Sequence, residues 1–334
     1  MNHLRTGSAW DLVGNTPLVR LSSLCKLTGC EIYGKAEFLN PGGSVKDRAA
    51  KGIIMDAENR GLLKPGGVIV EGTAGNTGIG LAVLAASRGY KVIVTMPEGQ
   101  TEEKYKMLEV LGAEVRRVPQ VPFKDERHFY HEARRIAESL PNAFWANQFE
   151  NPANGDFHYQ TTGPEIWEQT EGRIDIFTCA VGSSGTMSGV SRYLKEKKPS
   201  VEIVIADPYG SGIYSYLKTG KLETEGSSIT EGIGIMRITE NFRHVRADGA
   251  MRISDSEMID MIYHLAEHDG LFVGTSSGIN VMAAYRLAQM NAGSRKTIVT
   301  VLCDSGTRYA SRLLDQKWLA EKGLTPKPLV RMIA

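Results

Sequence analysis

The chain has 334 residues, which is too long for one compact core and predicts two domains. A hydrophobic fraction of 42% and a charged fraction of 23% are typical of a globular protein and exclude a disordered or membrane-embedded one. The 39 basic and 38 acidic residues give a net charge of +1, so we expect neither nucleic acid nor an anionic membrane as a partner.

The two sequence signals of cellular location agree with each other. Residues 1–7 contain no apolar signal core, and no apolar run approaches the length of a membrane span. The four cysteines, Cys25, Cys30, Cys179 and Cys303, form no C-x-x-C pair. We therefore expect a cytoplasmic protein in a reducing environment.

Short runs rich in Val and Ile alternate with helical patterns along almost the whole chain. Several runs lack two-residue alternation, as expected of parallel strands that are covered on both faces. This order predicts an α/β fold with mainly parallel sheets and right-handed crossovers. The predicted strands are 68–70, 91–95, 115–118, 174–181, 201–206, 271–273 and 297–302, and the predicted helices include 77–88, 102–111, 127–140, 185–197, 257–267 and 279–290.

Two irregular segments interrupt this alternation. Residues 147–155 are dense in turn formers and mark a candidate crossing between domains, whereas residues 222–238 form a long loop of the kind that lines sites. We expect a smaller domain over residues 47–151 and a larger one over residues 1–46 and 152–334.

An unusual lysine follows the first glycine-rich turn. Residues 40–43 read as a turn, and Ser44 with Asp47 is predicted to form a capping box at the start of a helix. Lys46 then lies on the apolar stripe of that helix and in its first turn, where the macrodipole disfavours a cation. Both effects favour a neutral amine or an imine, as in a catalytic lysine. The alternative is a structural lysine whose stem packs while its ammonium group reaches water.

Three further turns, residues 71–78, 181–186 and 273–278, are rich in glycine and hydroxyl groups and connect strands to helices. Such turns lie where open α/β sheets bind ligands, and they present backbone N–H groups to anions. Gly182–Thr186 suits a phosphate, and Thr73–Thr77 suits a carboxylate. Neither a Walker A motif nor G-x-G-x-x-G occurs. Pyridoxal phosphate (PLP) with an amino acid would satisfy the lysine and both loops. Alternatively, the glycines serve only tight turns.

Taken together, these segments resemble the cysteine synthase (O-acetylserine sulfhydrylase) family, whose group also holds the catalytic core of cystathionine β-synthase. The resemblance implies PLP-dependent fold type II, like the tryptophan synthase β subunit, with two three-layer αβα domains and the cofactor between them. It runs in order along nearly the whole chain. The matching segments are Gly14–Leu21, Asn40–Arg48, Thr73–Gly78, Gln148–Asn154, Thr161–Trp167, Gly182–Thr186, Glu231–Gly234, Ser276–Gly278 and Gly306–Tyr309.

The resemblance also implies a role for each matching residue. Lys46 would bind PLP as an internal aldimine and later move the α-proton. Asn76 would hydrogen-bond the ring oxygen of the cofactor, and Ser276 would face its pyridine nitrogen. The cofactor phosphate would be held by Gly182, Ser183, Ser184, Gly185 and Thr186, and the substrate carboxylate by Thr73, Gly75, Thr77 and Gln148.

The activity implied is that of a cysteine synthase, which converts O-acetyl-L-serine and sulfide to L-cysteine and acetate by way of α-aminoacrylate. The alternative within the group is cystathionine β-synthase, which uses serine or O-acetylserine with homocysteine. A dehydratase is disfavoured because those enzymes usually have Ser-Phe-Lys in place of Ser-Val-Lys46. A non-catalytic module would leave Lys46 unused. The resemblance further implies a homodimer and suggests a serine acetyltransferase as a partner.

Two positions depart from the common family pattern. Ala74 removes a hydroxyl from the carboxylate loop, and Ser184 replaces a glycine of the phosphate loop, where it needs a backbone angle that serine tolerates. His264 and His268 match an H-x-x-E-H zinc pattern, but they lie on the polar face of a predicted helix, and no partner motif follows. We expect no metal.

Overall fold

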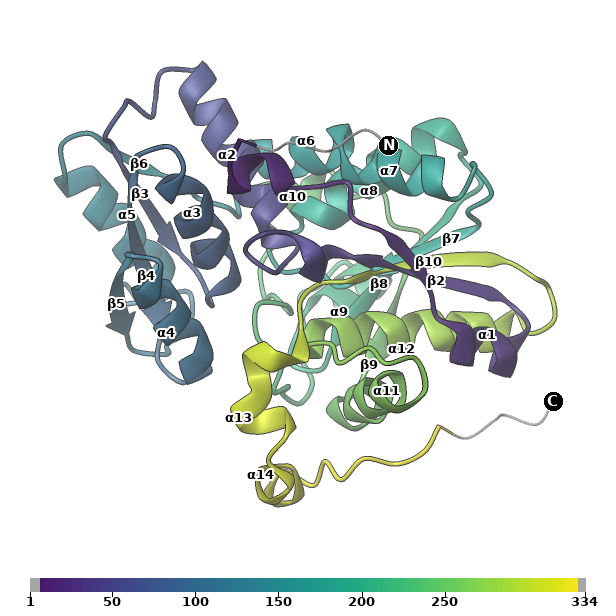
Figure 1. Ribbon diagram of the computed structural model, residues 1–334. Coiled ribbons are helices and arrows are strands. Elements are labelled where there is room, and N and C mark those ends of the chain that lie inside the picture. Colours follow the sequence, from purple (N-terminus) through teal and green to yellow (C-terminus); the bar gives the residue numbers. More distant parts are fainter. Residues whose placement is uncertain (1–6, 330–334) are drawn as a thin grey trace.

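The computed structural model describes residues 7–329. Figure 1 shows two α/β domains, with the smaller one formed by an early part of the chain, in blue, and the larger one by the remainder. The α/β architecture predicted from the sequence is confirmed. Residues 1–6 and 330–334, which include most of the stretch inspected for a signal and both ends of the predicted larger domain, lie outside the described residues.

A six-stranded sheet forms the centre of the larger domain. Its strand order is β1-β2-β10-β7-β8-β9, and the described pairings are parallel except that β1 runs antiparallel to β2. The first two strands come from the N-terminal part of the chain and the other four from its second half. The strands are β1 (Leu18–Arg20), β2 (Glu31–Ala36), β7 (Ile176–Cys179), β8 (Glu202–Pro208), β9 (Gly249–Ile253) and β10 (Thr297–Leu302).

The smaller domain has a four-stranded sheet in which all pairings are parallel, in the order β5-β4-β3-β6. The central strands are apolar and buried because helices cover both faces of the sheet. The strands are β3 (Val68–Gly72), β4 (Lys91–Pro97), β5 (Glu114–Val118) and β6 (Ala143–Trp145).

Helices cover both sheets, and α12 lies innermost among them. It is buried along most of its length because it lies between the large sheet and α11. The α-helices are α1 (Ser22–Thr28), α2 (Lys46–Asn59), α3 (Asn76–Ala86), α4 (Glu102–Val110), α5 (Phe129–Ser139), α6 (Ala153–Gln160), α7 (Thr162–Gln169), α8 (Gly185–Lys197), α9 (Ile213–Thr219), α10 (Glu240–Arg243), α11 (Asp255–His268), α12 (Thr275–Met290), α13 (Ala310–Leu313) and α14 (Gln316–Glu321), and the 3-10 helices are η1 (Ala9–Leu12), η2 (Glu37–Leu39) and η3 (Gly306–Tyr309).

One predicted strand is wrong. Residues 271–273 form no strand, and only Val273 makes an isolated bridge, to Ser305. Ser305 follows β10, whose two edges are already paired with β2 and β7, so no free edge is available there for a further strand. Strands β1, β2, β6 and β9 were not predicted because they are short or only partly buried, and their apolar runs are therefore weak.

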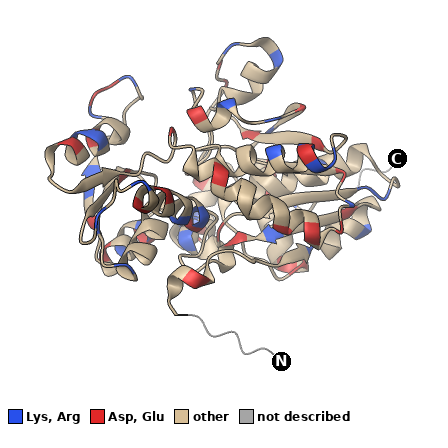
Figure 2. Ribbon diagram, turned by 90° about the horizontal axis from the view of Figure 1, so that it is seen from above, with Lys and Arg blue, Asp and Glu red and all other residues tan. Residues whose placement is uncertain are grey.

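Figure 2 shows basic and acidic residues interspersed along the ribbon of both domains. Within residues 7–329, no helix combines the length and the apolar character that crossing a bilayer requires. The same part of the chain places no three His, Cys, Asp or Glu side chains where they could share a metal ion. His264 instead contacts Ser23, with 2.9 Å between Nε2 and Oγ.

Candidate active site

A cavity of about 680 Å³ lies where the two domains meet. Its lining includes every predicted site residue except Gly75. Gly75 lies just behind the lining, where its φ of +126° and a clash of any Cβ with the Lys104 side chain at 2.7 Å both require glycine. The structure thus brings the predicted residues together from distant parts of the chain. They come from the starts of α2, α3, α8 and α12 and from the segment before α6.

Lys46 is the first residue of α2, lines the cavity and is partly buried. The predicted capping box around it is wrong. Val45 occupies the N-cap position without a side-chain cap, and Ser44 Oγ accepts a hydrogen bond from the Lys46 amide at 3.2 Å. The Asp47 carboxylate turns back to accept from the Gly42 amide at 2.5 Å. Asp47 therefore fixes the preceding turn rather than capping the helix. The fixed turn holds the start of α2, where Lys46 lines the cavity.

The phosphate loop, residues 182–186, connects β7 to α8. Ser184 was expected to need a backbone angle that serine tolerates, but its φ of +70° lies in the left-handed region that favours glycine. A Cβ added at Gly182 would lie 2.1 Å from the Gly232 carbonyl oxygen, and one at Gly185 would lie 2.0 Å from Asn154 Oδ1. Buried Ser184 Oγ has no hydrogen-bond partner among the described residues. A hydroxyl and helix N–H groups without protein partners, in a loop too tight for side chains, fit a phosphate group.

Two buried side chains of α6 support the phosphate loop from behind. Asn154 Nδ2 donates to Ser183 Oγ at 3.0 Å. One turn later, His158 Nε2 lies 3.2 Å from Thr186 Oγ1, and its Nδ1 lies 2.8 Å from Thr162 Oγ1. Burial lowers the pKa of His158 well below its ordinary value, so the imidazole is neutral at pH 7. The sequence analysis missed both residues, although their spacing of four on one helix was a usable signal.

The carboxylate loop is ordered by hydrogen bonds among its own members. Thr73 Oγ1 accepts from the Gly75 amide at 3.0 Å, and Thr77 Oγ1 donates to Gln148 Oε1 at 2.7 Å. Gln148 Nε2 in turn donates to Glu71 Oε1 at 3.2 Å. Burial raises the pKa of Glu71 to about 8, so this carboxyl is mainly neutral at pH 7. The loop can therefore receive an anionic substrate without a full negative charge behind it.

The third predicted turn places Ser276 in the first turn of α12, buried and against the cavity. Beneath it, Cys303 also lines the cavity, and its backbone amide donates to Ser277 Oγ at 2.8 Å. The Cys303 carbonyl accepts from the Val45 amide at 2.8 Å. This residue thereby joins the start of the lysine helix to the start of α12.

A segment without regular structure, residues 228–237, runs along the mouth of the cavity, and we call it the mouth segment. Its Glu231 is buried and forms ion pairs with Lys104 of the smaller domain and with Arg312, the latter at 2.7 Å. The irregular region 222–238 was predicted to line a site, and the structure confirms this for the mouth segment. The ion pairs were not predicted, because their partners are distant in sequence.

The other end of the mouth segment is held by Arg237. Its guanidinium carbon lies 4.5 Å from the centroid of the Phe123 ring and 4.9 Å from those of Tyr130 and Phe149, and it pairs with the Glu150 carboxylate. Guanidinium groups are attracted to aromatic faces at such distances. Glu231 and Arg237 therefore attach the mouth segment to the smaller domain at two points, whereas its first residues, Ser228 and Ile229, bond to Asp255 of the larger domain.

The comparisons with known proteins agree with this geometry. Residues 9–304 match the family described as "Pyridoxal-phosphate dependent enzyme". The chain is 54% identical to "Cysteine synthase 1" of Neurospora crassa, over 93% of this chain and 84% of that protein. It is 51% identical to "Cysteine synthase 1" of Emericella nidulans, over 97% of this chain and 89% of that protein.

Solved structures show the same relationship in three dimensions. An O-acetylserine dependent cystathionine β-synthase from Helicobacter pylori superposes with a TM-score of 0.85 and 34% identity, over 92% of this chain and 98% of that chain. A hydrogen sulfide-producing enzyme from Fusobacterium nucleatum gives 0.84 and 32%, over 91% and 100%. The chain belongs to the pyridoxal-phosphate dependent enzymes of fold type II, in the group that holds cysteine synthases and cystathionine β-synthases.

Proposed function

We propose that the protein is a cysteine synthase, which replaces the acetoxy group of O-acetyl-L-serine with sulfide to give L-cysteine and acetate. The observation that carries this proposal is the meeting of Lys46, the phosphate loop and the carboxylate loop in one cavity. The same cavity belongs to a chain with 54% and 51% identity to two cysteine synthases.

The residues present fit PLP. Gly182, Ser183, Ser184, Gly185 and Thr186 would hold its phosphate, Asn76 its ring oxygen, Ser276 its pyridine nitrogen and Lys46 its aldehyde carbon. Support comes from the unpartnered Ser184 hydroxyl and from the two glycines that leave no room for a Cβ. Thr73, Gly75, Thr77 and Gln148 would receive the substrate carboxylate through N–H and O–H groups at the start of α3.

When bound, PLP withdraws electrons from the α-carbon of an attached amino acid and so weakens its C–H bond. The Lys46 amine would accept that proton at Nζ and later return one to the α-carbon. Ser276 offers a hydroxyl rather than a carboxylate, so the chain has no anion there to hold a proton on the ring nitrogen. That arrangement favours loss of the β-acetoxy group over transamination.

We also propose the finer features that family membership suggests. These are domain boundaries at residues 46/47 and 151/152, a homodimer, a cytoplasmic location and docking of a serine acetyltransferase. The domain boundaries are supported by the confinement of β3 to β6 to the interval 47–151. The other three features rest on the resemblance, and size-exclusion chromatography with light scattering tests the homodimer.

A half-reaction tests the proposed function. Purified protein should be yellow, and borohydride should bleach the colour. Adding O-acetyl-L-serine alone should change the visible spectrum and release acetate, and subsequent sulfide should restore the spectrum and yield L-cysteine. Protein that stays colourless with added PLP, or a spectrum that O-acetyl-L-serine does not change, would contradict the proposal.

Cystathionine β-synthase activity is the second candidate. One solved relative, 34% identical to this chain, is described as an O-acetylserine dependent cystathionine β-synthase. After the first half-reaction, sulfide and homocysteine should be supplied separately at equal concentration. Faster recovery of the spectrum with homocysteine, with cystathionine as product, would favour the second candidate over the first.

A further inference from the structure

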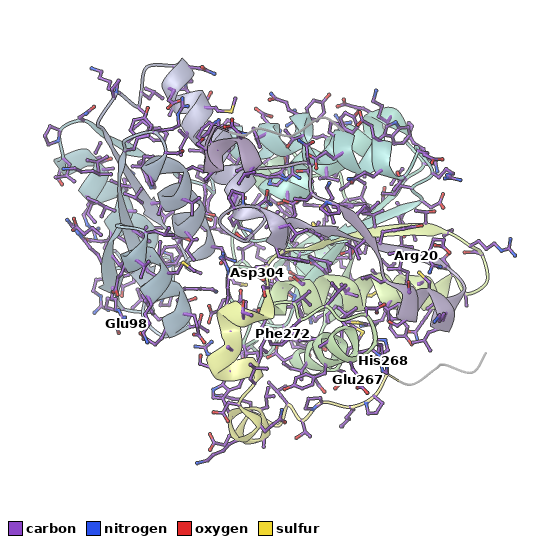
Figure 3. The ribbon with its side chains drawn as sticks, viewed as in Figure 1. Arg20, Glu98, Glu267, His268, Phe272 and Asp304 are labelled. Atoms are coloured by element: carbon purple, nitrogen blue, oxygen red, sulfur yellow. The ribbon has the colours of Figure 1, made fainter. Side chains whose placement is uncertain are left out.

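The side-chain amide of Asn76 lies between an acidic and a basic side chain. Asn76 Nδ2 donates to Asp304 Oδ2 at 2.7 Å, and its Oδ1 accepts from an Arg308 guanidinium nitrogen at 2.5 Å. Asn76 begins α3 of the smaller domain, whereas Asp304 and Arg308 follow β10 of the larger one. Figure 3 shows Asp304 where the C-terminal segment faces the smaller domain.

This arrangement fixes which way the amide faces. A carboxylate can only accept a hydrogen bond, and a guanidinium can only donate, so a flipped amide would oppose both partners. The amide nitrogen carries two hydrogens, and Asp304 takes one. Asn76 also lines the cavity, so its second N–H is available to a ligand there. Because Arg308 draws electron density toward Oδ1, that N–H is a stronger donor than in an isolated amide.

Asp304 is itself held firmly. It is fully buried, and its Oδ2 also accepts from the Tyr309 hydroxyl at 2.8 Å. Its other oxygen lies so close to Gly274 that a Cβ there would be 2.1 Å away. The carboxylate therefore has little freedom to turn away from Asn76.

Arg308 connects the amide to the loop that carries the lysine. Its second terminal nitrogen donates to the Gly42 carbonyl, four residues before Lys46. Its own carbonyl accepts from Thr101 Oγ1 of the smaller domain at 3.0 Å. One side chain thus contacts both the lysine loop and Asn76, which lie in different parts of the cavity wall.

We propose that Arg308 and Asp304 are positioning residues that orient and polarise Asn76, so that its free N–H binds an anionic oxygen on the aromatic ring of the cofactor. This inference rests on the cofactor contact proposed above for Asn76. Arg308 would additionally hold the Lys46 loop and Asn76 at a fixed separation. Neither residue is proposed to touch a reacting atom.

A double-mutant cycle tests this inference, with wild type, Asn76→Ala, Arg308→Gln and the double variant, each resolved and reconstituted with PLP. The readouts are the dissociation constant of PLP and the absorption maximum of the bound cofactor. Arg308→Gln alone should weaken PLP binding about tenfold, the size of one hydrogen bond to a charged group, and shift the absorption maximum. In the Asn76→Ala background the same substitution should weaken PLP binding and shift the absorption maximum much less, because only the Gly42 contact of Arg308 is then lost.

Two further variants separate positioning from general stability. Arg308→Lys keeps the charge but not the two-pronged geometry, and it should show a smaller shift of the absorption maximum than Arg308→Gln. Thr101→Val removes the contact with the Arg308 carbonyl and should leave the spectrum unchanged. Equal effects of Arg308→Gln with and without Asn76, or an unchanged spectrum, would overturn the inference. Wild type that binds no PLP would instead overturn the proposed function.

Discussion

The phosphate loop and the mouth segment line the same cavity but are held in place by different means. The phosphate loop is fixed by its backbone, with glycines at positions that admit no Cβ and with Asn154 and His158 packed behind it. The mouth segment has no regular structure, and its contacts with the smaller domain are made by two side chains, Glu231 and Arg237. Its backbone is bonded to the larger domain, where the Ile229 amide donates to Asp255 and the Gly234 amide donates to the Val181 carbonyl. We infer that the phosphate loop holds one ligand group rigidly, whereas the attachment of the mouth segment to the smaller domain depends on the ion pairs and ring contacts of two side chains.

The largest expected effect comes from Lys46→Ala, which removes the covalent bond to the cofactor and leaves the phosphate loop intact. Lys46→Ala should lower turnover by more than about 10³-fold, because it removes the proposed acid and base together. The rigid loop should still hold PLP without a covalent bond. Turnover measures catalysis. Cofactor absorbance that remains after borohydride treatment and dialysis measures covalent attachment of PLP to the protein. Lys51→Ala is the matched control, since this lysine of the same helix donates to the Trp10 carbonyl instead.

The next substitution attacks the rigid loop itself. Gly185→Ala should weaken PLP binding by about 10- to 100-fold, because the new methyl group would overlap with Asn154 and shift the loop. Titration of cofactor-free protein with PLP measures the loss. Gly249→Ala, at a glycine with nothing within 4 Å of its added Cβ, should bind PLP as wild type does. A Gly185→Ala protein with normal affinity would show that the loop is not rigid.

A substitution in the mouth segment should lower the stability of the protein rather than the affinity for PLP. Glu231→Gln leaves the buried Lys104 ammonium without its anion and should lower the free energy of unfolding by about 3 kcal/mol. The colour of the bound cofactor should not change, because the Glu231 side chain pairs with Lys104 and Arg312 and with none of the residues predicted to bind the cofactor. Urea unfolding measures the first effect. Glu240→Gln, which breaks the exposed pair with Arg243, should cost less than about 1 kcal/mol. A colour change in Glu231→Gln would mean that the two regions are coupled.

Away from both regions, the stability of the protein should depend on pH through Asp47, the residue after Lys46 in α2. Burial raises the pKa of Asp47 to about 7, above its ordinary value of 3.8. The folded protein therefore holds the Asp47 proton more tightly than the unfolded chain does. As pH rises from about 4 through 7, the unfolded chain loses this proton first, and the free energy of unfolding falls. Asp47→Asn should remove this loss, so its unfolding free energy relative to wild type should increase with pH across that interval. Asp56→Asn, on the exposed side of α2, should follow wild type.

Much of the site followed from local patterns. Glycine- and hydroxyl-rich turns after apolar runs mark the ends of parallel strands, and this placed Gly182–Thr186 and Thr73–Thr77 at the cavity. The left-handed angle of Ser184, with a φ of +70°, was not predicted, because serine rarely adopts it. The predicted capping box was wrong because the Asp47 side chain accepts from the Gly42 amide across the turn rather than from the start of the helix.

The sequence by itself determined the α/β order, the anion-binding turns and the unusual position of Lys46, because these depend on periodicity and on residues close together in the chain. The tertiary structure alone decided that Asp304 and Arg308 would hold Asn76 and that Glu231 would meet Lys104. These contacts join residues more than 100 positions apart. No local pattern predicts such a partner. The partner depends on how the two domains pack together, and no short segment of sequence specifies that packing.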